Sequence, residues 1–149
     1  MNIMKSLDRS RVKELVPRKG RSVLISITSP NSEFVQLHGD WTDVLRLKFD
    51  DVEQKDGQDY ELFSDIQAKQ ILDFVIKHLD KDIFVNCDAG LSRSPAVVVA
   101  LEQIFNANDV SNVSDYQHHN RFVKNKIRDI WFKNIWNPIW EDKRILVKE

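Results

Sequence analysis

Cys87 is the only cysteine of the chain, and the residues after it read Asp-Ala-Gly-Leu-Ser-Arg-Ser-Pro. Five residues separate it from Arg93. A loop of this kind, between a strand and a helix, can point successive backbone N–H groups at one centre, and the helix dipole adds partial positive charge there. The Arg93 guanidinium adds a planar pair of donors that fits two phosphate oxygens, which an ammonium group cannot reproduce. The residue types and their spacing therefore predict a phosphate-binding loop.

The same surroundings favour a thiolate at Cys87, because the loop donors and the guanidinium stabilise a negative sulfur. Attack of this sulfur on a phosphate monoester would form a phosphocysteine intermediate, and Ser94 could donate a hydrogen bond to the sulfur when it leaves. A cysteine is more often a small buried apolar residue than a nucleophile, but the Gly-x-Ser-Arg-Ser-Pro context reverses that expectation. We expect the phosphate to be bound by Asp88, Ala89, Gly90, Leu91, Ser92 and Arg93.

The stretch VNCDAGLSRSPAVVVAL resembles the signature of cysteine-dependent protein phosphatases, His-Cys-x5-Arg-Ser/Thr. Its Ala-Gly-x-Ser-Arg-Ser segment is most similar to the dual-specificity branch of the protein tyrosine phosphatases. The order of strand, acid loop and helix upstream is also similar, so the resemblance covers the region from Val23 to Phe105. It implies the family's α/β fold and hydrolysis of phosphotyrosine, with phosphoserine and phosphothreonine as further substrates, without a metal or another cofactor.

One residue departs from the family's pattern, since the histidine that usually precedes the cysteine is Asn86 here. In the family that histidine helps to arrange the loop and to activate the thiol. Asn86 can still hydrogen-bond to loop backbone, and the cysteine, the glycine, the arginine and both serines of the signature are present. We therefore expect a weakened or differently tuned enzyme rather than an inactive one.

The resemblance also implies a general acid, an aspartate upstream of the cysteine that protonates the leaving group. Asp50 and Asp51 are the candidates, in the stretch LKFDDVEQKDG. Asp51 is favoured because the family places its acid shortly after an alternating strand that ends in an apolar residue, here Phe49, and Asp50 is the alternative. Without the resemblance, adjacent aspartates would be interpreted as turn or cap residues. Asp56 and Asp59 are interpreted as solvated loop charges.

Three short runs are predicted as strands, namely Ser22–Ile27, Val44–Phe49 and Asp82–Asn86. The first and the last are apolar enough to be buried on both faces. Between the second and third strands, a Ser-x-x-Gln capping box starts a helix at Ser64. Its apolar residues recur at helical spacing and are Ile66, Ala68, Ile71, Leu72, Val75 and Leu79. A strand, a helix and a further strand form a crossover unit, which predicts an α/β fold with a mostly parallel central sheet flanked by helices.

A central, well covered helix is predicted after the loop, because Pro95 suits a first helical turn and AVVVALEQIF is apolar nearly all round. The segment from Tyr116 to Trp140 has apolar residues at helical spacing and is predicted to form one or two closing helices. Its tryptophans are expected to pack on the core rather than to bind a partner, and His118 and His119 to lie on the surface rather than bind metal. The tryptophans are Trp131, Trp136 and Trp140.

With 149 residues the chain is expected to form a single domain, residues 1–149. It has 22 basic and 23 acidic side chains, so no overall field favours nucleic acid or an anionic membrane as a partner. A run of ~20 apolar residues and the apolar centre of a signal peptide are both missing from the sequence. The lone cysteine agrees with a reducing compartment. These features predict a cytoplasmic protein, and its oligomeric state stays open.

The leading functional hypothesis is a protein phosphatase that acts on a phosphoprotein or phosphopeptide. Phosphatases of phosphoinositides or RNA 5′ ends are an alternative. Relatives that act on inositol lipids tend to have lysines in the loop, where this chain has Asp88 and no lysine, and those that act on RNA ends usually have Asn-Arg-Thr instead of Ser-Arg-Ser. A phosphate-binding pseudophosphatase is a further alternative, suggested by Asn86, but a binder has no need of Cys87.

Overall fold

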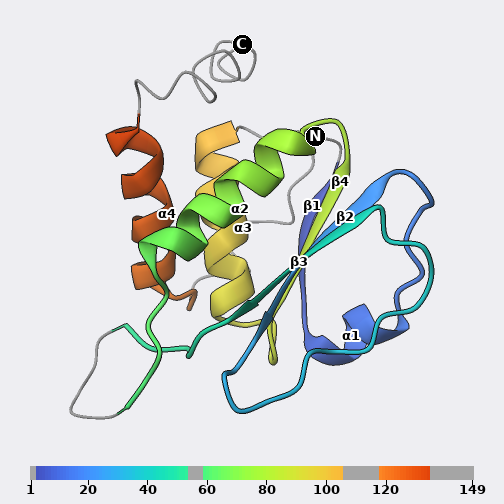
Figure 1. The fold of residues 1–149 in the computed structure, drawn as a ribbon, viewed down its shortest axis with the longest axis horizontal. Coiled ribbons are helices and arrows are strands. Elements are labelled where there is room, and N and C mark those ends of the chain that lie inside the picture. Colours follow the sequence, from blue (N-terminus) through green and yellow to red (C-terminus); the bar gives the residue numbers. More distant parts are fainter. Residues whose placement is uncertain (1–2, 54–58, 106–117, 135–149) are drawn as a thin grey trace.

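The computed structural model describes residues 3–53, 59–105 and 118–134. Parallel strands and helices alternate through most of this part of the chain (Figure 1). In chain order the described elements are β1 (Met4–Leu7), α1 (Arg9–Glu14), β2 (Ser22–Thr28), β3 (Asp43–Lys48), α2 (Asp65–Lys77), β4 (Asp82–Asn86), α3 (Arg93–Phe105) and α4 (Arg121–Lys133).

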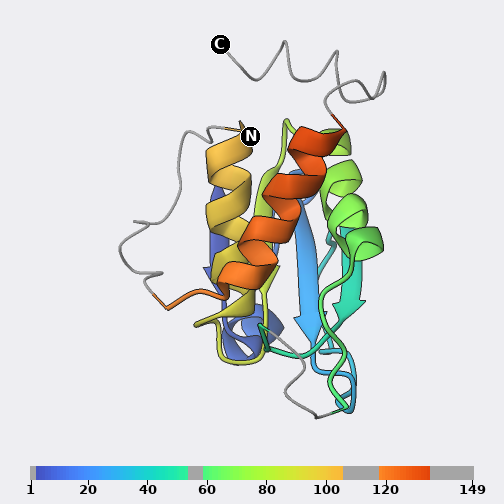
Figure 2. The same ribbon diagram turned by 90° about the vertical axis from the view of Figure 1, so that its left-hand side faces the viewer.

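The sheet has the strand order β1-β4-β2-β3, and each neighbouring pair is parallel. Helices α2, α3 and α4 lie together over one face, and α1 lies on the other (Figures 1 and 2). The larger apolar core fills the space beneath the three helices. A smaller cluster beside α1 contains Leu7, Val12, Leu24 and Val35. The predicted α/β class with a mostly parallel sheet is confirmed.

The predicted strands are found with small shifts at their ends. β4 has the predicted bounds, β2 continues to Thr28, and β3 ends at Lys48 instead of Phe49. Every residue of β2 is buried, as expected for a central strand with apolar layers on both faces. Because all strands run the same way, their carboxyl ends meet at one edge of the sheet, where the segments after β1, β2, β3 and β4 can approach each other.

The capping box of α2 forms as predicted. Gln67 N–H donates to Ser64 Oγ at 3.1 Å, and Ser64 N–H donates to Gln67 Oε1 at 3.0 Å. The predicted apolar stripe is wrong at Ile66, whose side chain is 71% exposed. Ile66 lies in the first turn of α2, and the buried residues of the helix begin at Ala68.

The helix after the loop is buried almost all round, as predicted. The closing helix α4 buries Val123, Ile127, Ile130 and Trp131, and Trp131 packs against Phe105 with 5.1 Å between ring centroids. Core packing is therefore confirmed for Trp131. The predictions for Tyr116, Trp136, Trp140 and Asp56 lie outside the described residues. Among the described helices, none has the length and apolarity to span a membrane.

Two elements near the amino terminus were not predicted. β1 has only four residues and pairs with β4 at the edge of the sheet, in a register that sets Ser6 opposite Val85. α1 follows directly, with Asp8 as its N-cap, because the Asp8 carboxylate accepts from Arg11 N–H at 2.7 Å. Both elements adjoin the Cys87 loop, since Arg9 N–H donates to the Asp88 carbonyl at 3.1 Å.

Candidate active site

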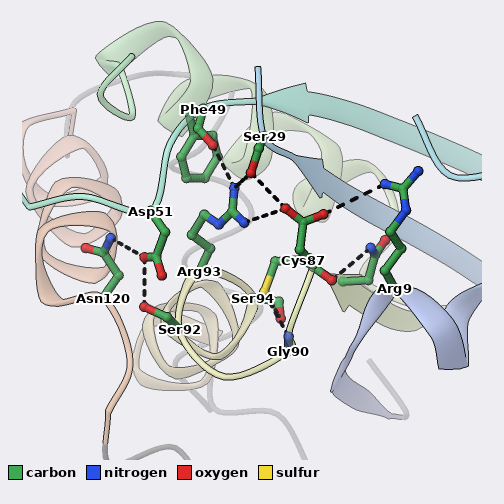
Figure 3. Close-up of polar contacts among 12 residues, drawn as sticks. Arg9, Ser29, Phe49, Asp51, Cys87, Gly90, Ser92, Arg93, Ser94 and Asn120 are labelled. Atoms are coloured by element: carbon green, nitrogen blue, oxygen red, sulfur yellow. Dashed lines mark hydrogen bonds and ion pairs between the residues drawn. The ribbon is translucent and has the colours of Figure 1, made fainter. Parts of the chain in front are cut away.

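The predicted phosphate-binding loop lies between the carboxyl end of β4 and the amino end of α3 (Figure 3). Gly90 is needed at its tip, because its φ is +70°, a conformation that other residues rarely adopt. A Cβ at this position would also lie 2.7 Å from the backbone nitrogen of Asp8. The start of α1 therefore packs against the loop so closely that only glycine fits.

Cys87 is 2% exposed, and its sulfur contacts the Gly90 N–H and the Ser94 hydroxyl group. The Gly90 N–H donates to Sγ at 3.2 Å, and the Ser94 hydroxyl oxygen lies 3.2 Å from Sγ (Figure 3). Hydrogen bonds of this kind favour the charged form of the acceptor. The loop thus brings Cys87 and Ser94 together as the sequence predicted, with Ser94 in place to stabilise a negative sulfur.

Asn86 supports the backbone of the loop. Its side chain is buried, and Nδ2 donates to the Cys87 carbonyl at 3.4 Å. Its Oδ1 has no hydrogen-bond partner among the described residues. The residue thus makes the expected backbone contact, a long one, and makes no described contact with the sulfur.

Arg93 is held in a fixed orientation. Its side chain is 6% exposed. Nη1 donates to the Phe49 carbonyl at 2.8 Å and to Ser29 Oγ at 3.2 Å, and Nη2 donates to Asp88 Oδ2 at 2.9 Å. Nε is buried and has no acceptor in the described part of the chain. Buried donors are almost always paired in proteins, so Nε is a donor that an oxyanion in the loop would satisfy.

The Asp88 side chain does not suit the predicted role of binding phosphate. Its carboxylate accepts from Ser29 Oγ at 2.7 Å and from Arg93, and it forms an ion pair with Arg9 at 3.8 Å. Burial raises the pKa of Asp88, but the hydrogen bonds from Ser29 and Arg93 and the charges of both arginines outweigh this and lower it. The side chain is thus an anion that orients Arg93, and only its backbone N–H can serve the predicted role.

The other loop residues contribute in different ways. The side chains of Ala89 and Leu91 are exposed, so their backbone N–H groups alone can serve the predicted phosphate binding. The Ser92 hydroxyl donates to Asp51 Oδ1 at 2.8 Å (Figure 3). The loop is therefore connected to the segment that follows β3.

The two candidate acids have different contacts. Asp51 Oδ1 accepts from Ser92 and from Asn120 Nδ2, the latter at 2.9 Å. Asp50 instead pairs with Glu61, since its N–H donates to the Glu61 carbonyl at 2.8 Å and its carboxylate accepts from Glu61 N–H at 2.8 Å. Asp59 is exposed. Asp51 therefore contacts the loop and the start of α4, whereas Asp50 contacts the segment before α2.

Asn120 was not predicted as part of this site. It is buried and is the N-cap of α4, with Oδ1 accepting from Val123 N–H at 3.1 Å. Its backbone N–H donates to the Ser92 carbonyl at 3.0 Å, and Nδ2 also lies 3.3 Å from the Val52 carbonyl oxygen. Asn120 therefore joins the acid segment, the loop and α4. An asparagine before an apolar helical pattern does indicate an N-cap, but not its partners.

His118 is exposed, as predicted, and His119 is half-buried. In residues 3–53, 59–105 and 118–134, no group of three or more histidine, cysteine, aspartate or glutamate side chains could hold a metal ion. The groups that the described site presents are a buried sulfur, a buried guanidinium whose Nε has no acceptor among the described residues, and the exposed carboxylate of Asp51.

No family model and no curated protein matches the sequence. Solved structures that are similar to this chain include the two that follow. The human tyrosine phosphatase-like serine/threonine/tyrosine-interacting protein has a TM-score of 0.52 and 17% identity, over 79% of this chain and 80% of that chain. PTPMT1, solved in complex with PI(5)P, has a TM-score of 0.51 and 15% identity, over 89% of this chain and 94% of that chain. The chain therefore has a phosphatase-like fold, a mostly parallel sheet with flanking helices.

Proposed function

We propose that this protein is a cysteine-dependent phosphatase that hydrolyses phosphotyrosine in phosphoproteins or phosphopeptides in the cytoplasm, with phosphoserine and phosphothreonine as further substrates. The observation that carries the proposal is the pairing of Cys87 and Arg93 in one loop. The sulfur accepts from the Gly90 N–H and lies 3.2 Å from Ser94 Oγ, and the buried guanidinium keeps Nε without an acceptor in the described residues. This unpaired Nε–H supports binding of an oxyanion in the loop.

In the first step the Cys87 thiolate attacks phosphorus. The S–P bond forms, the bond from phosphorus to the ester oxygen breaks, and the departing oxygen takes a proton from Asp51. Arg93 contributes most where charge develops on the transferring phosphoryl oxygens, because its orientation is already fixed by Phe49, Ser29 and Asp88.

In the second step water attacks the phosphorus of the phosphocysteine. Its proton passes to the Asp51 carboxylate, the S–P bond breaks, and the electron pair of that bond returns to Cys87 as the thiolate. Inorganic phosphate leaves. Ser94, 3.2 Å from Sγ, stabilises the sulfur as it becomes negative. Cys87 is again a thiolate and Asp51 is again protonated, so both return to their starting states.

The test is turnover of para-nitrophenyl phosphate and a phosphotyrosine peptide in the presence of a chelator. We expect turnover by the wild-type protein and none above background for Cys87→Ser, since an alcohol at this position is a much poorer nucleophile. Turnover that persists in Cys87→Ser, or that requires a metal ion, would rule out the phosphocysteine mechanism.

A second candidate activity is hydrolysis of a phosphoinositide. The likeness to PTPMT1, a structure with bound PI(5)P, favours it. The negative Asp88 within the loop favours the peptide substrate instead, because it repels additional phosphate groups near the site. Comparison of kcat/KM for a phosphotyrosine peptide and for PI(5)P in mixed micelles discriminates between them.

A third candidate is phosphate binding without catalysis. The likeness to a tyrosine phosphatase-like interacting protein favours it, and the absence of a described contact from Asn86 to the sulfur agrees with weaker activation. Phosphopeptide binding by the wild-type protein, without turnover on either substrate, would replace the catalytic proposal with this one.

A further inference from the structure

Ser6, on the unpredicted strand β1, reaches the nucleophile through a second hydroxyl group. Ser6 Oγ lies 2.7 Å from Ser94 Oγ, which lies 3.2 Å from Cys87 Sγ. Ser94 is fully buried and Cys87 is 2% exposed. The short contacts follow from the register of the sheet, because β1 runs beside β4 and sets Ser6 opposite Val85, two residues before the cysteine.

The proton count gives this chain of hydroxyl groups a direction. Each serine has one hydroxyl proton, and a thiolate can only accept. When Cys87 is ionised, the Ser94 proton therefore points to sulfur, and the 2.7 Å contact with Ser6 requires that Ser6 donates. When the sulfur has its own proton, the S–H group can donate to Ser94 and the direction is not fixed. Hydrogen bonds in such chains strengthen one another, so Ser6 favours the ionised sulfur.

Other groups at this end of the sheet do not duplicate this role. Asn86 contacts the Cys87 carbonyl instead of the sulfur. The charged groups of the loop and of the adjoining elements have other partners. Asp88 pairs with Arg9 and Arg93, Asp8 pairs with Arg11, and Asp51 accepts from Ser92 and Asn120. Ser6 is neutral, so its removal leaves these charges unchanged.

We propose that Ser6 is a positioning residue for the nucleophile. It directs the Ser94 hydroxyl group toward Cys87 and thereby increases the fraction of thiolate. Its importance for catalysis rests on the proposed phosphatase function. The effect on the sulfur itself does not, because it concerns only the ionisation of Cys87.

The experiment measures alkylation of Cys87 by iodoacetamide as a function of pH, followed by mass spectrometry of the intact protein. Cys87 is the only cysteine, so the rate reports on one thiol. We expect Ser6→Ala to lower the rate about two- to threefold near pH 6, from the strengthening expected along a hydrogen-bond chain that ends on a charge. The difference should vanish at high pH, where the sulfur is ionised in every variant. Ser6→Thr, which keeps the hydroxyl group, should restore the wild-type rate.

A double-mutant cycle separates positioning from a structural effect. In a Ser94→Ala background, Ser6→Ala should change nothing further, because the link to the sulfur is already broken. Lys5→Ala is the matched control on the same strand, since Lys5 is exposed and side chains alternate between faces, and it should alkylate as wild type does. Far-ultraviolet circular dichroism checks that each variant folds.

Two results would overturn the proposal. One is a wild-type alkylation profile for Ser6→Ala. The other is a loss of rate from Ser6→Ala that is as large in the Ser94→Ala background as in the wild-type protein. Both are read without any phosphatase assay. If the protein does not hydrolyse phosphate esters, the proposed function fails, while the alkylation cycle still decides whether Ser6 acts on the sulfur. The two failures are therefore distinguishable.

Discussion

The side of the site with the proposed nucleophile (the nucleophile side) and the side with the proposed acid (the acid side) are built in different ways. Cys87, Arg93 and Ser94 come from one continuous strand–loop–helix unit and are all buried. Asp51 is exposed, and its described hydrogen bonds come from two donors on separate segments, Ser92 and Asn120, which meet on one carboxylate oxygen.

This difference predicts which substrates each side should affect when its residues are substituted. On the nucleophile side, the guanidinium has three acceptors that fix its orientation before any ligand binds, so changes there should impair hydrolysis of every substrate. On the acid side, the carboxylate matters only when the leaving group needs a proton. The dependence of each defect on the leaving group is therefore the measurement that tests the comparison.

The largest effect is expected at Arg93. Arg93→Lys should lose nearly as much kcat as Arg93→Ala, about 10²- to 10³-fold or more, because the planar fork that matches two phosphoryl oxygens belongs to the guanidinium. The loss should be similar for para-nitrophenyl phosphate and for a phosphopeptide. Near-wild-type kcat for the lysine variant would show that Arg93 does not hold the phosphoryl group.

The next effect is expected at Asp51. Asp51→Asn should slow phosphopeptide hydrolysis by about 10²- to 10⁴-fold and remove the basic limb of its pH profile. The defect should shrink on para-nitrophenyl phosphate, whose leaving group departs with little help. Asp50→Asn is the matched control and should do neither, since Asp50 pairs with Glu61. If Asp50→Asn alone gives the leaving-group-dependent loss, the general acid is Asp50 instead of Asp51.

The surroundings of the Cys87 sulfur could be predicted from the sequence because the contacts with Gly90 and Ser94 are local. Cys87, Gly90 and Ser94 lie within eight residues, and the strand before them and the helix after them have strong apolar patterns. The side-chain contacts of Asp88 were not predicted. Its carboxylate pairs with Arg93 and with Arg9 from an unpredicted helix, while phosphate binding by its backbone N–H stays a prediction.

Other contacts could not be predicted because they depend on how distant segments meet. Asn120 lies 69 residues from Asp51, and Ser29 lies 64 residues from Arg93. Neither spacing nor residue type indicates these pairs before the sheet order is known. β1 has only four residues, too few for a clear alternation of apolar and polar side chains. In α2 the helical spacing indicated which face is apolar but not at which residue burial begins, which explains the error at Ile66.

A smaller effect is expected at Asn120, which acts through Asp51. Asn120→Ser keeps an oxygen for the α4 cap but is too short to reach the carboxylate. We expect about a three- to tenfold loss on a phosphopeptide, the size of one hydrogen bond, and a smaller loss on para-nitrophenyl phosphate. Combined with Asp51→Asn it should add little, because both changes remove the same function. Equal losses on the two substrates would instead indicate damage to the loop through Ser92.

An effect of similar size, which tests the rigidity of the loop around Arg93, is expected at Asp88. Asp88→Asn should lower turnover about three- to tenfold, because Arg93 keeps its contacts with Phe49 and Ser29.

The pH dependence of thermal stability is a second and more specific measurement on Asp88→Asn. Burial raises the pKa of Asp88, but hydrogen bonds from Ser29 and Arg93 and the nearby arginine charges outweigh it, so the folded-state pKa lies below the ordinary value of 3.8. A carboxyl group with a lowered pKa stabilises the fold fully above its unfolded pKa, and this stability is lost as the pH falls through the folded value. The Tm of Asp88→Asn should therefore lie below that of the wild type by a constant amount from about pH 7 to pH 5, and the gap should narrow below about pH 4. Asp59→Asn, at an exposed position, should show no such gap. A gap that widens in acid would mean that Asp88 is not the anion that orients Arg93.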